Sequence, residues 1–164
     1  MGINNPTDRG LAALFASLWR QPVQHGGHDF CMDHPWRRLR HLNDWLLEWG
    51  QLPEGISGEI NWPTHTITID PRLSQAQRRC ALAHELEHVM RGPAPKWDEA
   101  REEAVVERTA ARRLVSIDEL ASAVQWTRDP VELAEELWID ADMLSALVDG
   151  LTPSERAKVN QALM

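Results

Sequence analysis

Between residues 74 and 92 the chain shows its clearest hydrophobic pattern, with apolar residues at helical spacing. Ser74 and Gln77 form an S-x-x-Q capping box at the start of this stretch, and Gly92 followed by Pro93 ends it. The apolar side consists of Leu82, Leu86, Val89 and Met90. The pattern therefore predicts a well-bounded helix that packs one side against the core.

Three short stretches before this helix alternate apolar and polar residues, as half-buried strands do. They cover residues 45–49, 56–60 and, with the clearest alternation, 64–69. We expect a small sheet of about three strands packed on the helix, which is an α+β arrangement. Because the 64–69 strand directly precedes the helix, we expect it at the lip of a cleft, where an unpaired edge binds an extended peptide. His65 would then face the site, although a single strand histidine is more often a packed or surface residue.

Helical patterns lie on both sides of this central region. Near the N-terminus, residues 11–19 are amphipathic and residues 36–42 predict a short helix. Towards the C-terminus, Ser116, Asp129 and Thr152 each stand three residues before a glutamate, which predicts at least three short helices. We therefore divide the chain into an N-terminal extension, a central core and a C-terminal helical segment, at residues 1–34, 35–120 and 121–164.

Two C-terminal stretches have the length and apolar spacing of a helix-turn-helix. Residues 131–137 and 141–148 are joined by a turn at 138–140. Both stretches carry acidic residues, and the chain has a formal net charge of −8, from 25 acidic residues against 17 Lys and Arg. Because such a surface repels phosphates, we expect this segment to pack or contact protein, and we expect neither nucleic acid nor a membrane as partner.

With 164 residues the chain is long enough to bury one substantial core. No uncharged apolar stretch of about 18 residues occurs, and the N-terminus lacks the pattern of a secretory signal. The two cysteines, Cys31 and Cys80, do not make the framework of a secreted disulfide-rich domain. We therefore expect a cytoplasmic protein.

The predicted helix carries His84, Glu85 and His88, which match the pattern H-E-x-x-H. Two histidines four residues apart project from one face of a helix, so both imidazoles can reach a single metal ion. Neutral imidazoles bind zinc without cancelling its Lewis acidity, and an open coordination position can hold a water molecule. A neighbouring carboxylate can then take a proton from that water. We therefore expect a metal site with Glu85 as the general base, rather than a chance match.

A catalytic zinc usually takes a third protein ligand, and the next predicted helix offers acidic candidates. Asp98 is the expected N-cap of this helix, and Glu102, Glu103 and Glu107 follow it. Glu103 and Glu107 share a face, so one can bind the metal while the other orients a histidine. The alternative is that these acids pair on a solvated face with arginines, namely Arg101, Arg108 and Arg112.

A second group of potential ligands lies nearer the N-terminus, where every third residue is a histidine or a cysteine: His25, His28, Cys31 and His34. All four are ligand types for zinc. Their spacing matches no closed zinc module, and the intervening diglycine suggests a loop. A second metal site here is therefore the less favoured hypothesis.

The motif and its surroundings resemble the ImmA/IrrE family of metallo-endopeptidases. The resemblance is carried by residues 83–88, by residues 67–70 before them, and by Glu103 and residues 110–115 after them. It spans roughly residues 36 to 120 and implies a zincin-like metallopeptidase core. The family often has an Ala-Asn-x-Phe-Ala segment near its third ligand, which this chain lacks.

Carried over by position, the resemblance implies that His84 and His88 bind Zn²⁺ and that Glu85 is the catalytic acid and base. Glu103 is the favoured third ligand and Glu107 the alternative. The implied function is that of a zinc-dependent endopeptidase that cleaves a regulatory protein, such as a repressor, by means of a metal-activated water.

The competing hypothesis is a non-catalytic regulator, in which the metal is structural and the C-terminal helices bind a protein partner or DNA. The intact Glu85 favours the enzyme, and the acidic charge argues against DNA.

Overall fold

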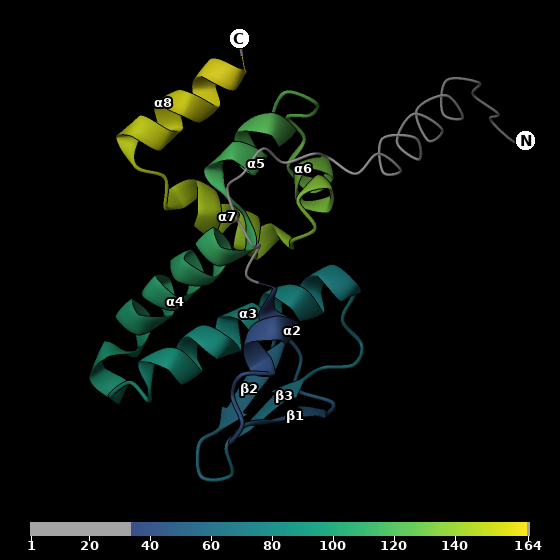
Figure 1. The fold of residues 1–164 in the computed structure, drawn as a ribbon, viewed down its shortest axis with the longest axis vertical. Helices are drawn as coiled ribbons and strands as arrows, with labels where there is room; N and C mark the ends of the chain where they lie inside the picture. The colour runs from purple at the N-terminus through teal and green to yellow at the C-terminus, as the bar shows by residue number, and fades with distance from the viewer. Residues whose placement is uncertain (1–33, 164) are drawn as a thin grey trace, which may run out of the picture. The chain divides into compact units, whose positions relative to one another are not determined.

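The computed structural model describes residues 34–163 (Figure 1). The helix expected at 11–19, and His25, His28 and Cys31 of the histidine-rich group, lie outside the described residues. The division of the chain into segments 1–34, 35–120 and 121–164 stays a prediction. Within the described part, the fold is the expected α+β arrangement, with helices beside a small sheet.

The sheet has three strands, β1 (Leu46–Trp49), β2 (Gly58–Asn61) and β3 (Thr66–Ile69), in the order β1-β3-β2. β1 runs parallel and β2 antiparallel to β3. Ile67 and Ile69, which point to one face of β3, are completely buried. The covered face of the sheet is therefore the one that carries these apolar residues of the alternating stretch.

The position of β3 corrects one expectation. β3 is the central strand and pairs on both sides, so the free edge expected on the 64–69 strand does not exist. The strand with the most buried residues takes the middle of the sheet, and the edges belong to β1 and β2. An extended peptide can therefore pair with β2, but not with β3.

Helix α3 (Gln75–Arg91) begins and ends where the sequence predicted. Both hydrogen bonds of the Ser74–Gln77 capping box are present, and Gly92 has φ 85° at the C-cap. Figure 1 shows the helix in the middle of the described part, between the sheet and the helices from α4 onward. Leu82 and Leu86 pack in the core next to the sheet, whereas Cys80 and Ala83 belong to the core of the helical part.

This central position explains a difference from the predicted single apolar side. A second side of α3, formed by small residues such as Cys80 and Ala83, is also buried, whereas Met90 near the end of the helix is 61% exposed. The pattern of large apolar residues alone identified only the side of the helix that faces the sheet.

Two further elements flank α3. Helix α2 (Pro35–Leu39) is shorter than the predicted 36–42 helix. Helix α4 (Glu99–Leu114) follows the 3₁₀ turn η1 (Lys96–Asp98) and packs along α3. Asp98 is its N-cap residue, but its side chain accepts no capping hydrogen bond.

Four short helices complete the fold: α5 (Ile117–Ala123), α6 (Pro130–Glu136), α7 (Ala141–Asp149) and α8 (Pro153–Ala162). Ser116 and Thr152 make the predicted capping boxes, and Asp129 caps α6 with its side chain. Helices α6 and α7 coincide with the predicted helix-turn-helix stretches.

Arg79 connects α3 to these helices. Its side chain is almost fully buried, and it donates to the carbonyl oxygens of Leu114 at 2.9 Å and Trp138 at 2.8 Å. Next to it, the Sγ atom of Cys80 accepts a hydrogen bond from the backbone N–H of Asp140. These contacts attach the end of α4 and the turn between α6 and α7 to the first half of the histidine-bearing helix.

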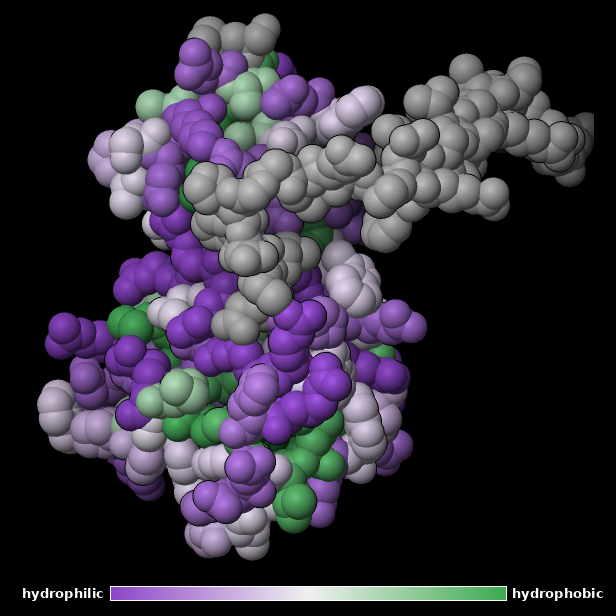
Figure 2. All heavy atoms as spheres, in the orientation of Figure 1, coloured by the Kyte–Doolittle hydropathy of each residue, from purple (hydrophilic) through white to green (hydrophobic). Residues whose placement is uncertain are grey.

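The surface is predominantly polar where helices meet solvent. In the view of Figure 2, the larger apolar patches of the described part lie in the lower half, around the sheet, and hydrophilic residues cover much of the rest of this face. Within residues 34–163, no helix has both the length and the apolar character needed to cross a bilayer.

Candidate metal centre

His84, His88 and Glu103 converge at one point between α3 and α4. The two Nε2 atoms lie 3.1 Å apart, and the carboxylate oxygens of Glu103 lie 3.2 Å from Nε2 of His84 and 3.1 Å from Nε2 of His88. In the part of the chain that the structure describes, these residues form a group whose potential ligand atoms all lie within 4.8 Å of one another. Helix α3 supplies the two histidines one turn apart, and α4 brings the carboxylate across from a position 15 residues further along the chain.

The chemistry of this donor set fits a metal ion. Two imidazole nitrogens and one carboxylate are a common ligand set of catalytic zinc sites, which keep a fourth position open. Burial, and then the neighbouring His88, lower the pKa of His84, which favours the neutral imidazole needed for metal binding.

The structure separates the acidic candidates on α4. Glu102 makes an ion pair with Arg91, and Glu107 lies outside the group that contains Glu103. Arg112 pairs with Glu155, not with these acids. The surface ion pairs expected under the alternative interpretation are therefore absent for Glu103 and Glu107 among the described residues.

Glu85 lies beside this group, and only 8% of the residue is exposed. Its side chain faces a cavity that also contains the group. Burial raises the pKa of Glu85 to about 8, with further contributions from the negative charges of Glu103 and Glu59. A carboxyl in such surroundings exchanges a proton near neutral pH, as a general base and acid must.

Gly58 on β2 makes room for Glu85. A Cβ atom at this position would lie 2.6 Å from Oε1 of Glu85, well inside van der Waals contact. Sequence reasoning missed this residue. The available signal was a glycine inside a predicted strand, which often marks a close approach of another group to the backbone.

A cavity of about 890 Å³ contains the site. Its walls come from β2 and the turn before it, from α3 and α4, and from the first half of α7. The edge strand β2 therefore lies directly against the histidine and glutamate cluster.

His65 does not belong to this cavity. It has φ 50° in the turn between β2 and β3, and its ring stacks on Trp45 with 5.0 Å between centroids. The hypothesis that His65 faces the site is not supported. The alternative of a surface or packed residue describes it, because His65 is exposed and one side of its ring contacts Trp45. His34 of the histidine-rich group lies at the N-cap of α2, also away from the cavity lining.

Comparison with protein-family models gives a match over the region that contains the site. The family model of the M78 peptidases, described as the IrrE N-terminal-like domain, matches residues 50–146, which include both helices of the site and the edge strand. Comparison with curated proteins and with solved structures gave no significant match in either case. With the matched region covering more than half of its length, the chain belongs to the M78 peptidase family, of the IrrE N-terminal-like type.

Proposed function

We propose that this protein is a zinc-dependent endopeptidase. The observation that carries the proposal is the convergence of two histidines and a glutamate beside the buried carboxyl of Glu85, in a cavity bordered by an edge strand. Membership of a peptidase family supports the reaction class.

His84, His88 and Glu103 would hold the zinc ion. When bound, zinc supplies a Lewis acid that polarises the scissile carbonyl and makes a water molecule more acidic. The positive charge would also favour the ionised form of Glu85 and so offset the effect of burial on its pKa.

The protein's own residues supply positioning and proton transfer. Glu85 takes the proton of the attacking water and later gives it to the leaving amine. The free edge of β2 offers backbone groups that hold an extended peptide across the cavity. Gly58 keeps the Glu85 carboxyl close to that strand, because a larger residue would occupy its place.

The substrate we propose is a protein, such as a transcriptional regulator, in keeping with the family resemblance. An extended segment of that protein would enter the cavity, because only an extended backbone pairs with a strand edge.

The first prediction concerns Glu85→Gln, which conserves size and leaves both histidines intact. The variant should bind zinc normally but lose about a hundredfold to ten-thousandfold in cleavage rate, because glutamine cannot accept a proton. The substrate can be identified by expressing both forms in the native host and comparing the protein fragments by mass spectrometry. Cleavage is then measured with the purified, zinc-loaded proteins.

Glu135→Gln, which alters an exposed glutamate on α6, is the matched control and should cleave as wild type does. Equal fragment patterns in wild type and Glu85→Gln, with both proteins carrying zinc, would refute the enzymatic role and favour a regulator with a structural metal.

A further inference from the structure

The cavity is lined by many more acids than the proposed reaction uses. Among residues 34–163, eight carboxylate side chains line it, and Lys96 is the only Lys or Arg in the lining. Four of the acids have an assigned role: Glu85 and Glu103 belong to the site, Glu102 pairs with Arg91, and Asp140 caps α7.

The remaining four acids, Glu59, Glu99, Glu107 and Asp142, are exposed. Within residues 34–163, none of their carboxylates forms a hydrogen bond or an ion pair. Like charges that face one cavity repel each other, so this arrangement costs stability unless a positive partner enters.

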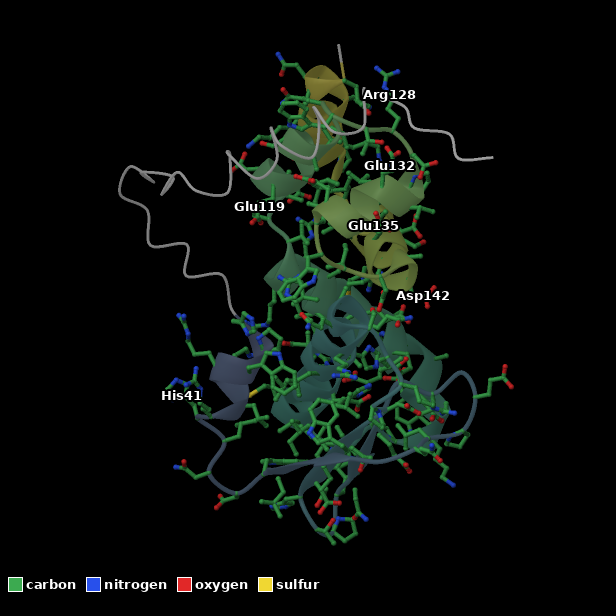
Figure 3. All side chains as sticks on the ribbon, turned by 90° about the vertical axis from the view of Figure 1, so that its right-hand side faces the viewer. His41, Glu119, Arg128, Glu132, Glu135 and Asp142 are labelled. Atoms are coloured by element: carbon green, nitrogen blue, oxygen red, sulfur yellow. The ribbon has the colours of Figure 1, made fainter. Side chains whose placement is uncertain are left out.

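The four acids surround the site on three sides. Glu99 and Glu107 stand one turn before and one turn after Glu103 on α4, so all three side chains lie along one face of that helix. Glu59 comes from the edge strand β2, and Asp142 from the first turn of α7. Figure 3 shows Asp142 at the end of the C-terminal helices nearest to α3 and α4, with Glu135 and Glu132 further away on the same side.

A second observation indicates that the cavity receives a ligand. Glu85 is more than nine-tenths buried and lines the cavity, and its side-chain carboxyl has no hydrogen-bond partner among the described residues. Next to it, β2 pairs only with β3, which leaves its other edge free for a strand. An extended peptide can form backbone hydrogen bonds with this edge, and cationic side chains of that peptide can pair with the surrounding carboxylates.

We propose that the substrate segment is a positively charged extended peptide, whose Lys or Arg side chains pair with Glu59, Glu99, Glu107 and Asp142. This specificity rests on the peptidase function proposed above. One turn of α4 spans about 5.4 Å, and an extended chain advances about 3.3 Å per residue. Long cationic side chains within about three residues of the scissile bond therefore reach these carboxylates.

The test uses the zinc-loaded full chain and fluorogenic peptide pools that differ only in charge. One pool carries Lys and Arg on both sides of a randomised centre, and the other carries Gln at the same positions. We expect kcat/KM for the basic pool to be roughly 5- to 20-fold higher, which corresponds to a few exposed ion pairs. The preference should shrink in high salt, because ions screen exposed charges.

The double variant Glu107→Gln/Asp142→Asn should lower this preference at least twofold while zinc content stays at the wild-type value. Glu135→Gln/Glu136→Gln removes the same charge from exposed positions on α6 outside the cavity lining, and should keep the preference. Equal cleavage of the two pools by wild type would overturn the proposed specificity and leave the peptidase intact.

Binding is measured separately, so that a failure of catalysis does not hide the answer. Zinc-loaded Glu85→Gln protein is titrated with labelled basic and neutral peptides, and fluorescence anisotropy reports binding. Tighter binding of the basic peptide, reduced by Glu107→Gln/Asp142→Asn, supports the proposed specificity even if wild type cleaves neither pool, a result that would count against the peptidase. Equal binding of the two peptides would overturn the specificity.

Discussion

At the scale of single residues, Glu103 and Glu107 show how packing separates two equivalent candidates. Both lie on one face of α4 and both line the cavity, but Glu103 alone has its carboxylate within 3.2 Å of both Nε2 atoms. The side chain of Glu107 begins four residues further along the helix, about 6 Å away along its axis.

We therefore predict that Glu103→Ala lowers the affinity for zinc by at least tenfold, whereas Glu107→Ala changes it less than threefold. Competition with a chromophoric chelator measures both affinities under the same conditions. Native mass spectrometry of wild type should show about one zinc per chain, because the group supplies one set of three ligands. A larger loss for Glu107→Ala would exchange the two roles.

Glu85 provides a second prediction at this scale, for the metal-free protein. Because burial raises the pKa of this carboxyl from 4.5 to about 8, the folded state holds its proton more tightly than the unfolded state does. Its contribution to stability is complete below about pH 4.5 and is lost as the pH rises towards 8. Glu85→Gln does not titrate, so it should be more stable than wild type at pH 8 by about 4 kcal/mol, and the difference should become small near pH 4.

Urea denaturation of chelator-treated protein at several pH values measures this difference. Zinc should reduce it, since a nearby cation favours the ionised carboxylate. The Glu135→Gln control should follow wild type throughout. If Glu85→Gln and wild type lose stability in parallel between pH 5 and 8, the carboxyl is ionised in the folded metal-free protein and the assignment of its environment is wrong.

At the scale of elements, the site depends on how α3 is held between the sheet and the C-terminal helices. Glu87, between the two histidines in sequence, is 2% exposed and pairs with Arg38 of α2 and Arg113 of α4. Arg79 joins the other half of α3 to the ends of α4 and α6. These buried charges fix the register of α3 against its neighbours, and so the distance between the histidines and Glu103.

We predict that Arg79→Met lowers the free energy of unfolding by about 2–4 kcal/mol, because buried carbonyl oxygens at two helix ends lose their donor. Arg101→Met, which changes an exposed arginine on α4, should lower it by less than about 0.5 kcal/mol. Chemical denaturation in zinc-containing buffer compares the two variants. A loss for Arg79→Met as small as that of the control would show that the contact carries no net stability.

At the scale of the whole described unit, the cavity forms only because separate parts of the chain assemble around α3. The edge strand β2, helix α4 and the start of α7 each supply one wall. The C-terminal helices therefore do more than cover the core, since Asp140, Asp142 and Met143 of this segment line the cavity.

Much of this architecture follows from local patterns in the sequence. The bounds of α3, its capping box, the two histidines on one face and the caps at Ser116, Asp129 and Thr152 depend on residues within one or two helical turns, and the structure agrees with each. Three strands were also predicted, although each proved shorter than its alternating stretch.

Features that depend on residues far apart in the chain could be read only from the tertiary structure. β2, and not β3, forms the edge of the sheet beside the site. The order of the strands depends on which faces of the sheet become buried, and a single strand's pattern does not specify that. The approach of Glu103 to the histidines, the space that Gly58 leaves for Glu85, and the acids from β2, α4 and α7 around one cavity all result from packing between elements. The sequence by itself determined which groups can do chemistry, because residue type and helical spacing are local. Their distances from one another required the fold, because those distances depend on long-range packing.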